Sequence, residues 1–373
     1  MLESITLKCR PGAQFHFGKI ALDENTSLND TSHILHSDSL ASAFVDTAFR
    51  VMSDITAQAV LADFEQGTVR VSSLLWQVDL PGGRQVYFLP KPVSLNAVDI
   101  SPQNDAAQTS GGKKEEERKD ILRVRFISKG VWEAGIQPKD WSDKKKCIVL
   151  QREFVLTREE ATILDKEGKD ITEDVSKKLK LYHTVSLPKV AVHKLTREDS
   201  LYHQTNVQVA RLADYGLPSA SVHFYFLLES SDPAARDRVR NLAHIMADEG
   251  IGGERSVGCG KLECAENPAP FQLDPSKKTE KLLCTASLVS PASQIEFDSC
   301  HAWKIITRGG RPTTSDGPLK RMKMLAEGAM LRSKIVGKTH VIGKSVQYGY
   351  EYRRFGTALC LPAHDHHQPT TAP

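Results

Sequence analysis

The sequence contains no long apolar run and no closely paired cysteines, and each absence argues against a class of protein. No hydrophobic stretch approaches the roughly 20 residues of a membrane-spanning helix, and the first residues lack the apolar core of a signal peptide. The seven cysteines are scattered without a Cys-x-x-Cys pair, which favours reduced thiols over a disulfide framework or a zinc site. We therefore expect a cytoplasmic protein that needs no metal, cofactor or membrane.

Length, composition and charge are those of a soluble globular protein. The chain has 373 residues, of which 40% are hydrophobic and 25% charged, and the length suggests two domains. The net charge of +3 hides an asymmetry, because residues 301–373 hold 12 Lys and Arg against 4 Asp and Glu. This C-terminal region is the expected surface for a polyanion, with a solvated basic face as the alternative.

A cluster of glycines is the clearest motif. Five glycines lie within residues 250–260, with Arg255 and Ser256 at their centre. Apolar residues at helical spacing over 233–249 put the cluster after a helix, whereas nucleotide-binding loops precede one, and Lys261 is not followed by Ser or Thr. Such glycines let backbone N–H groups approach an anion, so we predict a phosphate-binding loop instead of a nucleotide hydrolase. The alternative is a helix C-cap that leads into a surface turn.

Strand and helix patterns recur in the order of a ferredoxin-like unit, once in residues 2–90 and again from residue 221 onward. We therefore predict an α+β fold of two tandem ferredoxin-like (RRM-like) units. The first helix starts near Ser37 and Asp38, either of which would cap it. The predicted parts of the chain are a first domain over 1–208 with an insertion at about 101–180 and a hairpin at 190–208, a second domain over 209–360 with the glycine-rich loop, and a disordered tail over 361–373.

Several segments together resemble one protein family. The form Gly-Gly-x-Arg-Ser-x-Gly-x-Gly, placed after the helix of the second unit, resembles the signature of the RAMP superfamily of CRISPR proteins. Residues 34–40, 87–92, 188–192 and 325–329 are similar to segments of the fourth Csm subunit of type III-A effector complexes. One departure is Cys259, which stands where an aromatic residue is frequent.

The resemblance implies a non-catalytic, RNA-binding subunit of a ribonucleoprotein that acts in antiviral defence. Such a subunit holds the 5′ repeat-derived handle of the CRISPR RNA (crRNA), caps the backbone filament and docks the large signalling and nuclease subunit. The implied partners are the crRNA, the large subunit, the adjacent backbone RAMP subunit and, indirectly, target RNA. The equivalent subunit of a type III-B complex is an alternative that differs chiefly in its partners.

The glycine loop supplies the first set of candidate RNA-binding residues. Backbone N–H groups and Arg255 would cradle phosphates while the hydroxyl of Ser256 adds one hydrogen bond. The second set is His36 and Ser37 at a helix N-terminus, where capping and local packing are an equally good interpretation. The glycines in the first set are Gly252, Gly253, Gly258 and Gly260.

The hairpin at 190–208 resembles the thumb that RAMP proteins press against crRNA, which adds a thumb-like β-hairpin to the predicted fold. Arg197, Tyr202 and His203 would stack on an unstacked base, unless the segment is an ordinary hairpin with a polar tip. Lys320 and Arg321 lie in the densest basic run of the C-terminal region. They would face RNA, an acidic partner or solvent.

An enzyme is the main rival hypothesis. A RAMP endoribonuclease that processes precursor crRNA would use His36 or His16 as its general acid or base, because histidine titrates near neutrality. Neither histidine has a Tyr and a Lys beside it in a recognisable catalytic arrangement. We therefore predict a protein without enzymatic activity.

Overall fold

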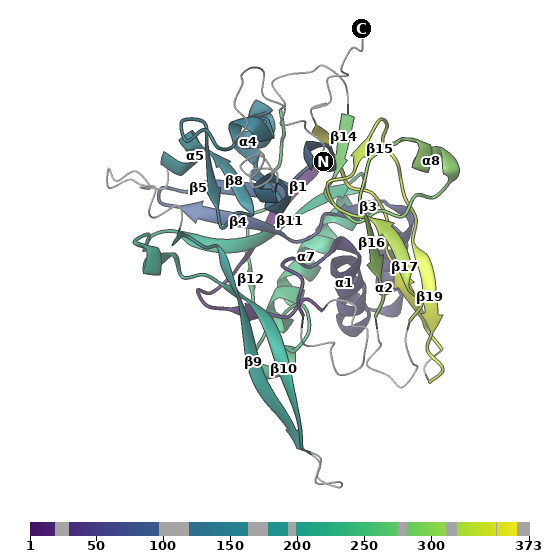
Figure 1. The fold of residues 1–373 in the computed structure, drawn as a ribbon. Coiled ribbons are helices and arrows are strands. Elements are labelled where there is room, and N and C mark those ends of the chain that lie inside the picture. The colour runs from purple at the N-terminus through teal and green to yellow at the C-terminus, as the bar shows by residue number, and fades with distance from the viewer. Residues whose placement is uncertain are drawn as a thin grey trace.

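The computed structural model describes residues 1–18, 30–96, 119–162, 178–192, 199–274, 282–310, 319–347 and 349–363. Its largest element is a ten-stranded sheet with the order β12-β1-β11-β4-β5-β6-β8-β7, in which β13 also pairs with β1 and β3 with β11 (Figure 1). The strands are β1 (Leu2–Lys8), β3 (Val69–Val71), β4 (Leu75–Leu80), β5 (Arg84–Pro90), β6 (Phe126–Ser128), β7 (Cys147–Leu150), β8 (Phe154–Thr157), β11 (Ser221–Ser230), β12 (Glu263–Cys264) and β13 (Ala269–Pro270).

The two halves of the chain share this sheet, which differs from the predicted pair of tandem units. Strand β1 lies between β11 and β12, and each pairing is antiparallel. Strand β11 is apolar on both faces and almost wholly buried, so both of its edges need partners from the N-terminal half. Strands β3 and β4 both pair with β11 and together take the place of one strand. In chain order, β1, the helices that follow it, this interrupted strand, β11, its helix and β12 then give the βαββαβ pattern of one ferredoxin-like unit.

Three helices contact one another beside this sheet (Figure 1). They are α1 (Ser37–Val51), α2 (Asp54–Gln66) and α7 (Pro233–Glu249); α1 starts where the sequence predicted, and α7 matches its predicted range. Helix α7 begins at Asp232, whose carboxylate accepts from the N–H groups of Ala234 and Ala235. Gly250 follows α7 directly, so the predicted position of the glycine cluster after a helix is confirmed.

The predicted insertion is partly an extension of the sheet. Residues 119–162 of it form β6, β7 and β8. These strands continue the sheet beyond β5, with which β6 pairs. The same residues also form α4 (Lys129–Ala134), η3 (Pro138–Asp140) and α5 (Arg158–Thr162). The first part of the predicted insertion, residues 101–118, lies outside the described residues.

A long hairpin extends from the body of the molecule (Figure 1). Strands β9 (Tyr182–Val192) and β10 (Asp199–Val209) pair antiparallel, and β2 (Gln14–Phe15) joins β10 at the hairpin base. The hairpin begins eight residues earlier than the predicted residue 190, because Tyr182 packs into the core on Trp76, with ring centroids 5.1 Å apart. Its tip, residues 193–198, lies outside the described residues, and so does Arg197.

The C-terminal part forms smaller sheets. The four-stranded sheet has the order β15-β18-β14-β21, and two hairpins pair β16 with β17 and β19 with β20. Strand β21 ends at Ala363, so the tail predicted from residue 361 starts too early, and 364–373 lie outside the described residues. The elements are β14 (Leu282–Thr285), α8 (Gln294–Asp298), β15 (Cys300–Ala302), β16 (Ile305–Arg308), β17 (Met322–Leu325), β18 (Met330–Leu331), β19 (His340–Lys344), β20 (Glu351–Arg354) and β21 (Cys360–Ala363), besides the short η2 (Val93–Asn96), η4 (Leu212–Tyr215) and η5 (Arg255–Val257).

The described part of the chain contains neither a membrane-spanning helix nor a cluster of metal ligands. None of its helices has the length and apolar character needed to cross a bilayer. In the same residues, no cluster of three or more histidines, cysteines or carboxylates is arranged to hold a metal ion.

Candidate nucleic-acid interface

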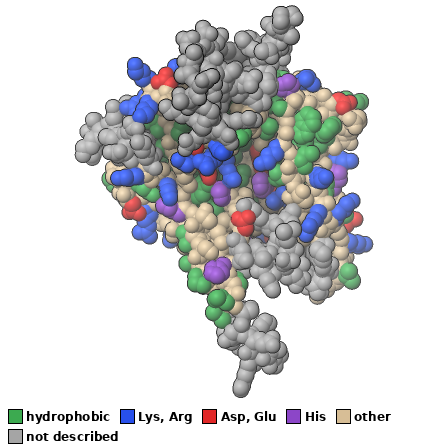
Figure 2. All heavy atoms as spheres, in the orientation of Figure 1, with side chains coloured by type: hydrophobic (Ala, Val, Ile, Leu, Met, Phe, Trp, Pro, Cys, Tyr) green, Lys and Arg blue, Asp and Glu red, His purple; other side chains and the backbone are tan. Residues whose placement is uncertain are grey.

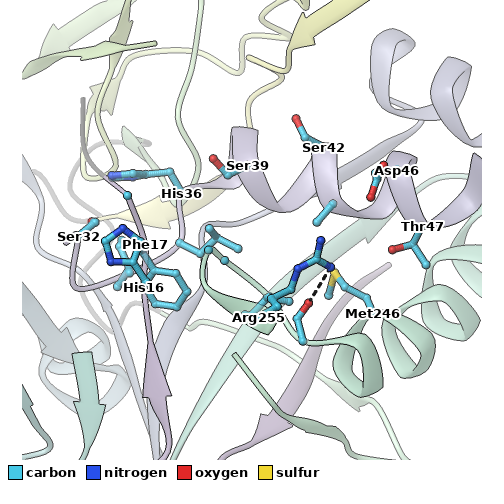
Figure 3. Close-up of a pocket in the computed structure, with 18 of the residues that line it drawn as sticks. His16, Phe17, Ser32, His36, Ser39, Ser42, Asp46, Thr47, Met246 and Arg255 are labelled. Carbon is cyan, nitrogen blue, oxygen red and sulfur yellow. Dashed lines mark hydrogen bonds between the residues drawn. The ribbon is translucent and has the colours of Figure 1, made fainter. Parts of the chain in front are cut away.

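A cleft of about 380 Å³ lies between α1, the segment that precedes it and the glycine-rich loop after α7. His36 and Arg255, which are 219 positions apart in the chain, both line it together with Gly252 and Gly253 (Figure 3). The cleft thus brings together members of the two sets of residues that the sequence suggested separately: His36 from one, and Gly252, Gly253 and Arg255 from the other.

At two positions of the loop, close backbone contacts leave room only for glycine. Gly260 has φ +86°, and a Cβ there would lie 2.3 Å from the carbonyl oxygen of Ile251. Gly252 has φ +84°, and its Cβ would lie 2.6 Å from the carbonyl oxygen of His16. These contacts fold the loop back on itself and onto the strand segment at His16, which fixes one wall of the cleft.

We expect Gly260→Ala to destabilise the protein more than Gly258→Ala, by about 1–2 kcal/mol of unfolding free energy. Both residues have positive φ, but a Cβ at Gly258 would meet no atom within 4 Å, so Gly258→Ala controls for backbone strain alone. Urea denaturation of the two variants measures the difference. Equal destabilisation would contradict the role assigned to the Gly260–Ile251 contact.

Most N–H groups of the loop are hydrogen-bonded inside the protein, so fewer of them than predicted are available to bind a phosphate. Within residues 250–260, seven of these donors bond to backbone carbonyls, as in the 2.8 Å bond from Gly253 to His16. The N–H groups of Gly252 and of residues 254–256 are the remaining candidates for a ligand in this part of the described chain. The predicted glycines Gly253, Gly258 and Gly260 therefore shape the loop with their backbone donors already used.

Arg255 and Ser256 are exposed at the surface of the loop. The Arg255 guanidinium makes one long contact, 3.5 Å from Nη1 to the carbonyl oxygen of Gly250. Ser256 lines a second, open depression beside the cleft, which also includes Arg50 and Glu249. Arg255 borders both hollows, so its charge can reach a ligand in either.

The other arginines near the cleft are committed to carboxylates. Arg50 of α1 bonds to Glu249 with Nη1–Oε1 at 2.7 Å and to Asp46 with Nε–Oδ2 at 3.1 Å. Arg308 of β16 donates to the buried carboxylate of Asp38, with Nε–Oδ2 at 2.9 Å. Arg255 is therefore the cation of the cleft that is placed best for a new anion.

Neither Ser37 nor Asp38 is the N-cap residue of α1, so the predicted cap position is wrong, although Oδ1 of Asp38 accepts from the N–H of Ser39 in the first turn at 2.8 Å. His36 occupies the N-cap position without a side-chain cap bond, and both predicted caps lie inside the helix. The Ser37 hydroxyl accepts from the N–H of Leu288, and Asp38 bonds to Arg308 and to Arg354 of β20, with Nη1–Oδ2 at 2.7 Å to Arg354. Residues from the C-terminal part of the chain bond to both side chains. Ser37 is buried and does not line the cleft.

Asp38 is a charged residue with no exposed surface. Burial, the largest influence, would raise the pKa of its carboxyl, but the charges of Arg308 and Arg354 outweigh it and hold the pKa at about 2. The cluster of Asp38 and these two arginines joins the start of α1 to two C-terminal strands. It therefore holds one side of the cleft in place.

His36 presents its ring to the cleft (Figure 3). Its Nδ1 lies 2.7 Å from Oε1 of Glu327, in the turn between β17 and β18. Sequence reasoning singled out residues 325–329 as a family-like segment without giving Glu327 a role. A carboxylate set among Leu325, Ala326 and Ala329 was the signal that could have drawn attention to it.

The hairpin meets the glycine loop at Cys259. The buried amides of Gln204 and Asn206 on β10 donate to Cys259 Sγ at 3.8 Å and 3.6 Å. Side chains alternate between the two faces of a strand, so Tyr202 shares the face of Gln204 whereas His203 points to the other face. The two residues predicted to act together therefore face opposite ways, and Lys189, directly opposite Tyr202, joins the loop-facing side.

The basic pair Lys320 and Arg321 is exposed just before β17. Neither residue lines the cleft or the depression beside it. Figure 2 shows Lys and Arg side chains distributed over one whole face of the molecule, with several gathered near its centre beside histidines. The predicted basic run is thus one part of a wider distribution of positive charge.

The mixed sheet and the three packed helices together define an α+β protein, and its glycine-rich loop follows a helix as the resemblance to RAMP proteins implies. No family model matches the chain. It is 26% identical over 360 residues to the CRISPR system Cms protein Csm4 of Methanocaldococcus jannaschii, which covers 90% of this chain and 87% of that protein.

Solved structures show the same fold. A chain of the Csm3–Csm4 subcomplex of a type III-A CRISPR-Cas interference complex matches with a TM-score of 0.61 and 18% identity, covering 97% of this chain and 99% of that one. A chain of a Csm1–Csm4 cassette in complex with cA4 matches with a TM-score of 0.53 and 12% identity, covering 97% and 98%. The resemblance to the fourth Csm subunit is thereby confirmed: the chain is similar in sequence to a Csm4 protein and shares its fold with a chain of a Csm3–Csm4 subcomplex.

Proposed function

We propose that the chain is the non-catalytic subunit of a cytoplasmic type III-A CRISPR complex that holds the 5′ handle of the crRNA in the cleft. The observation that carries this proposal is the meeting of Arg255, the glycine loop and His36 at one hollow. Single-stranded RNA is held by its phosphates and by bases splayed onto side chains, and such a hollow offers both an arginine and unbonded backbone donors.

The RNA would run from the cleft over Ser256 and onto the loop-facing side of the hairpin. The hairpin base is bonded to the loop through Cys259, so these surfaces are continuous. On that side Tyr202 offers a ring for base stacking and Lys189 a charge for phosphate. Arg197, outside the described residues, keeps its predicted role of stacking on a base, and Lys320 and Arg321 would add more distant contacts to the RNA.

We expect Tyr202→Ala to weaken handle binding about fivefold, because it removes a ring from the side of the hairpin that faces the loop. His203→Ala is the matched control, since it truncates the neighbouring residue on the opposite face. Fluorescence anisotropy with labelled handle RNA measures both. A larger loss for the His203 variant would reverse the proposed orientation of the hairpin.

The partners follow from the complexes in which similar chains are found. Structures with this fold come from a Csm3–Csm4 subcomplex and from Csm1–Csm4 cassettes. We extend both relations to this chain: it would cap a filament of Csm3-type subunits and dock a Csm1-type large subunit in antiviral defence, with target RNA contacted indirectly.

Co-expression tests the whole proposal. The chain should copurify with the Csm1-type and Csm3-type proteins of its own locus, and the complex should protect the 5′ handle of the crRNA from nuclease digestion. A complex that assembles but leaves the handle as accessible as free RNA would contradict the proposed RNA site.

A processing endoribonuclease is a second candidate because His16 and His36 line the same cleft. Nδ1 of His16 lies 2.9 Å from the carbonyl oxygen of Thr205, so its other nitrogen is left for a substrate. Among the described lining residues, no Tyr or Lys completes a catalytic set. Precursor crRNA incubated with the purified chain should stay intact, and site-specific cleavage that is lost in His36→Ala would favour the enzyme.

A further inference from the structure

The contact between His36 and Glu327 joins the cleft to the C-terminal part of the chain. Nδ1 of His36 is 2.7 Å from Oε1 of Glu327, and the side chains retain 17% and 8% of their accessible surface. The Ser73 hydroxyl donates to the same carboxylate oxygen and accepts from the N–H of Ser37, at 2.9 Å. Ser73 and His36 thus both bond to Oε1 of Glu327. The Ser73 bond fixes the position in which the carboxylate meets the histidine.

Glu327 is ionised in this setting. Burial, the strongest influence, raises the pKa of its carboxyl, but the charge of His36 and the hydrogen bonds from His36 and Ser73 together lower it below the ordinary value. A carboxylate accepts hydrogen bonds and cannot donate them, so the hydrogen on the bonded nitrogen belongs to Nδ1 of His36. Nε2 is then left for the cleft, as an acceptor when the ring is neutral and as a donor when it is protonated.

Most of the other charged groups around His36 are paired with an opposite charge. Asp38 of α1 lies between Arg308 of β16 and Arg354 of β20, and this cluster carries one net positive charge. Arg50 is balanced by Asp46 and Glu249. On the glycine loop Arg255 is always protonated, and His36 and the neighbouring His16 are the histidines that line the cleft.

We infer that Glu327 is a positioning residue that holds His36 with Nε2 toward an RNA phosphate, which makes handle binding depend on protonation of that histidine. This inference rests on the proposed function of the cleft. A phosphate at Nε2 accepts a charge-assisted hydrogen bond from imidazolium and none from the neutral ring with hydrogen on Nδ1. RNA affinity should therefore rise as the pH falls.

The test is anisotropy of labelled handle RNA with the full chain at constant ionic strength, between about pH 5 and pH 8. We expect wild-type affinity to be about tenfold greater at the acidic end. Glu327→Gln keeps the size of the side chain and removes its charge, and should flatten the profile to that of His36→Asn. The double variant should show no further loss, because the two residues act as one unit.

Two control variants separate the possible outcomes. His244→Asn changes an exposed histidine on α7 outside the cleft and should keep the wild-type profile. Arg255→Ala should lower affinity at every pH and keep the slope. A Glu327→Gln protein that is folded by circular dichroism and retains the wild-type profile overturns the inference while leaving the proposed function intact, whereas a wild-type chain that binds no handle RNA at any pH overturns both.

Discussion

Replacing Asp38 by alanine should lower the free energy of unfolding by about 3–5 kcal/mol, because two buried arginines then lose their shared carboxylate. Arg308 and Arg354 are each only 8% exposed, so neither can recover its hydration without opening the structure. Urea denaturation followed by circular dichroism gives the value. Asp38→Asn, which keeps the shape and removes the charge, serves as the second variant if the alanine protein does not fold.

Asp46→Ala is the matched control on the same helix. Asp46 also bonds an arginine, but its side chain is 62% exposed, and a surface ion pair of this kind contributes less than about 1 kcal/mol. Similar losses of unfolding free energy in the Asp38 and Asp46 variants would show that the contribution of the Asp38 cluster to stability does not depend on its burial.

The same cluster predicts an acid dependence. The pKa of Asp38 in the folded protein, about 2, is below its value in the unfolded chain, so its ionised form stabilises the fold above the ordinary pKa of aspartate. That contribution is lost as the pH falls from about 5 toward 2. Asp38→Asn should show a shallower decline in stability over this interval, and an unchanged decline would assign the acid sensitivity to other carboxylates.

Arg255→Ala should weaken handle RNA binding about tenfold at moderate salt, since a phosphate contact is lost with the guanidinium. Arg255 is exposed, borders both hollows and makes a single long contact to Gly250 within the described protein. The plot of log affinity against log salt concentration should also lose about one unit of slope. Anisotropy titrations at several salt concentrations measure both effects.

Arg84→Ala is the control for this variant. Arg84 is an exposed arginine at the turn between β4 and β5 and lines neither hollow. Its removal lowers the net charge by the same amount and should leave the salt slope close to that of the wild type. Handle affinity unchanged in the Arg255 variant would remove this residue from the site.

Local sequence pattern was enough to predict the helices and the glycine loop. Residues 233–249 have apolar side chains at helical spacing, Asp232 and Pro233 at the start and Gly250 at the end, so every local preference agrees on a helix there. The same local agreement predicted the hairpin, although the hairpin boundary depended on the distant packing of Tyr182.

Contacts between remote segments could not be predicted in this way. Ser37 and Asp38 have the composition of helix caps, and only the arrival of Leu288, Arg308 and Arg354 from elsewhere in the chain gives them other partners. The pairing of His36 with Glu327 spans 291 positions and has no local pattern. For the same reason the meeting of His36 with Arg255 in one cleft is a result of the fold, and sequence could nominate them only one at a time.

The position of β1 bears on how the protein is made. Its residues pair with β11 on one side and with β12 on the other, more than 200 positions further along the chain. During synthesis the first strand therefore has to remain unpaired until the ribosome has released β11, and its second edge stays open until residue 264 has followed, so the central sheet closes late. Separately expressed halves cut near residue 208 would each expose an open sheet edge, so they should be insoluble alone and recover solubility only when produced together.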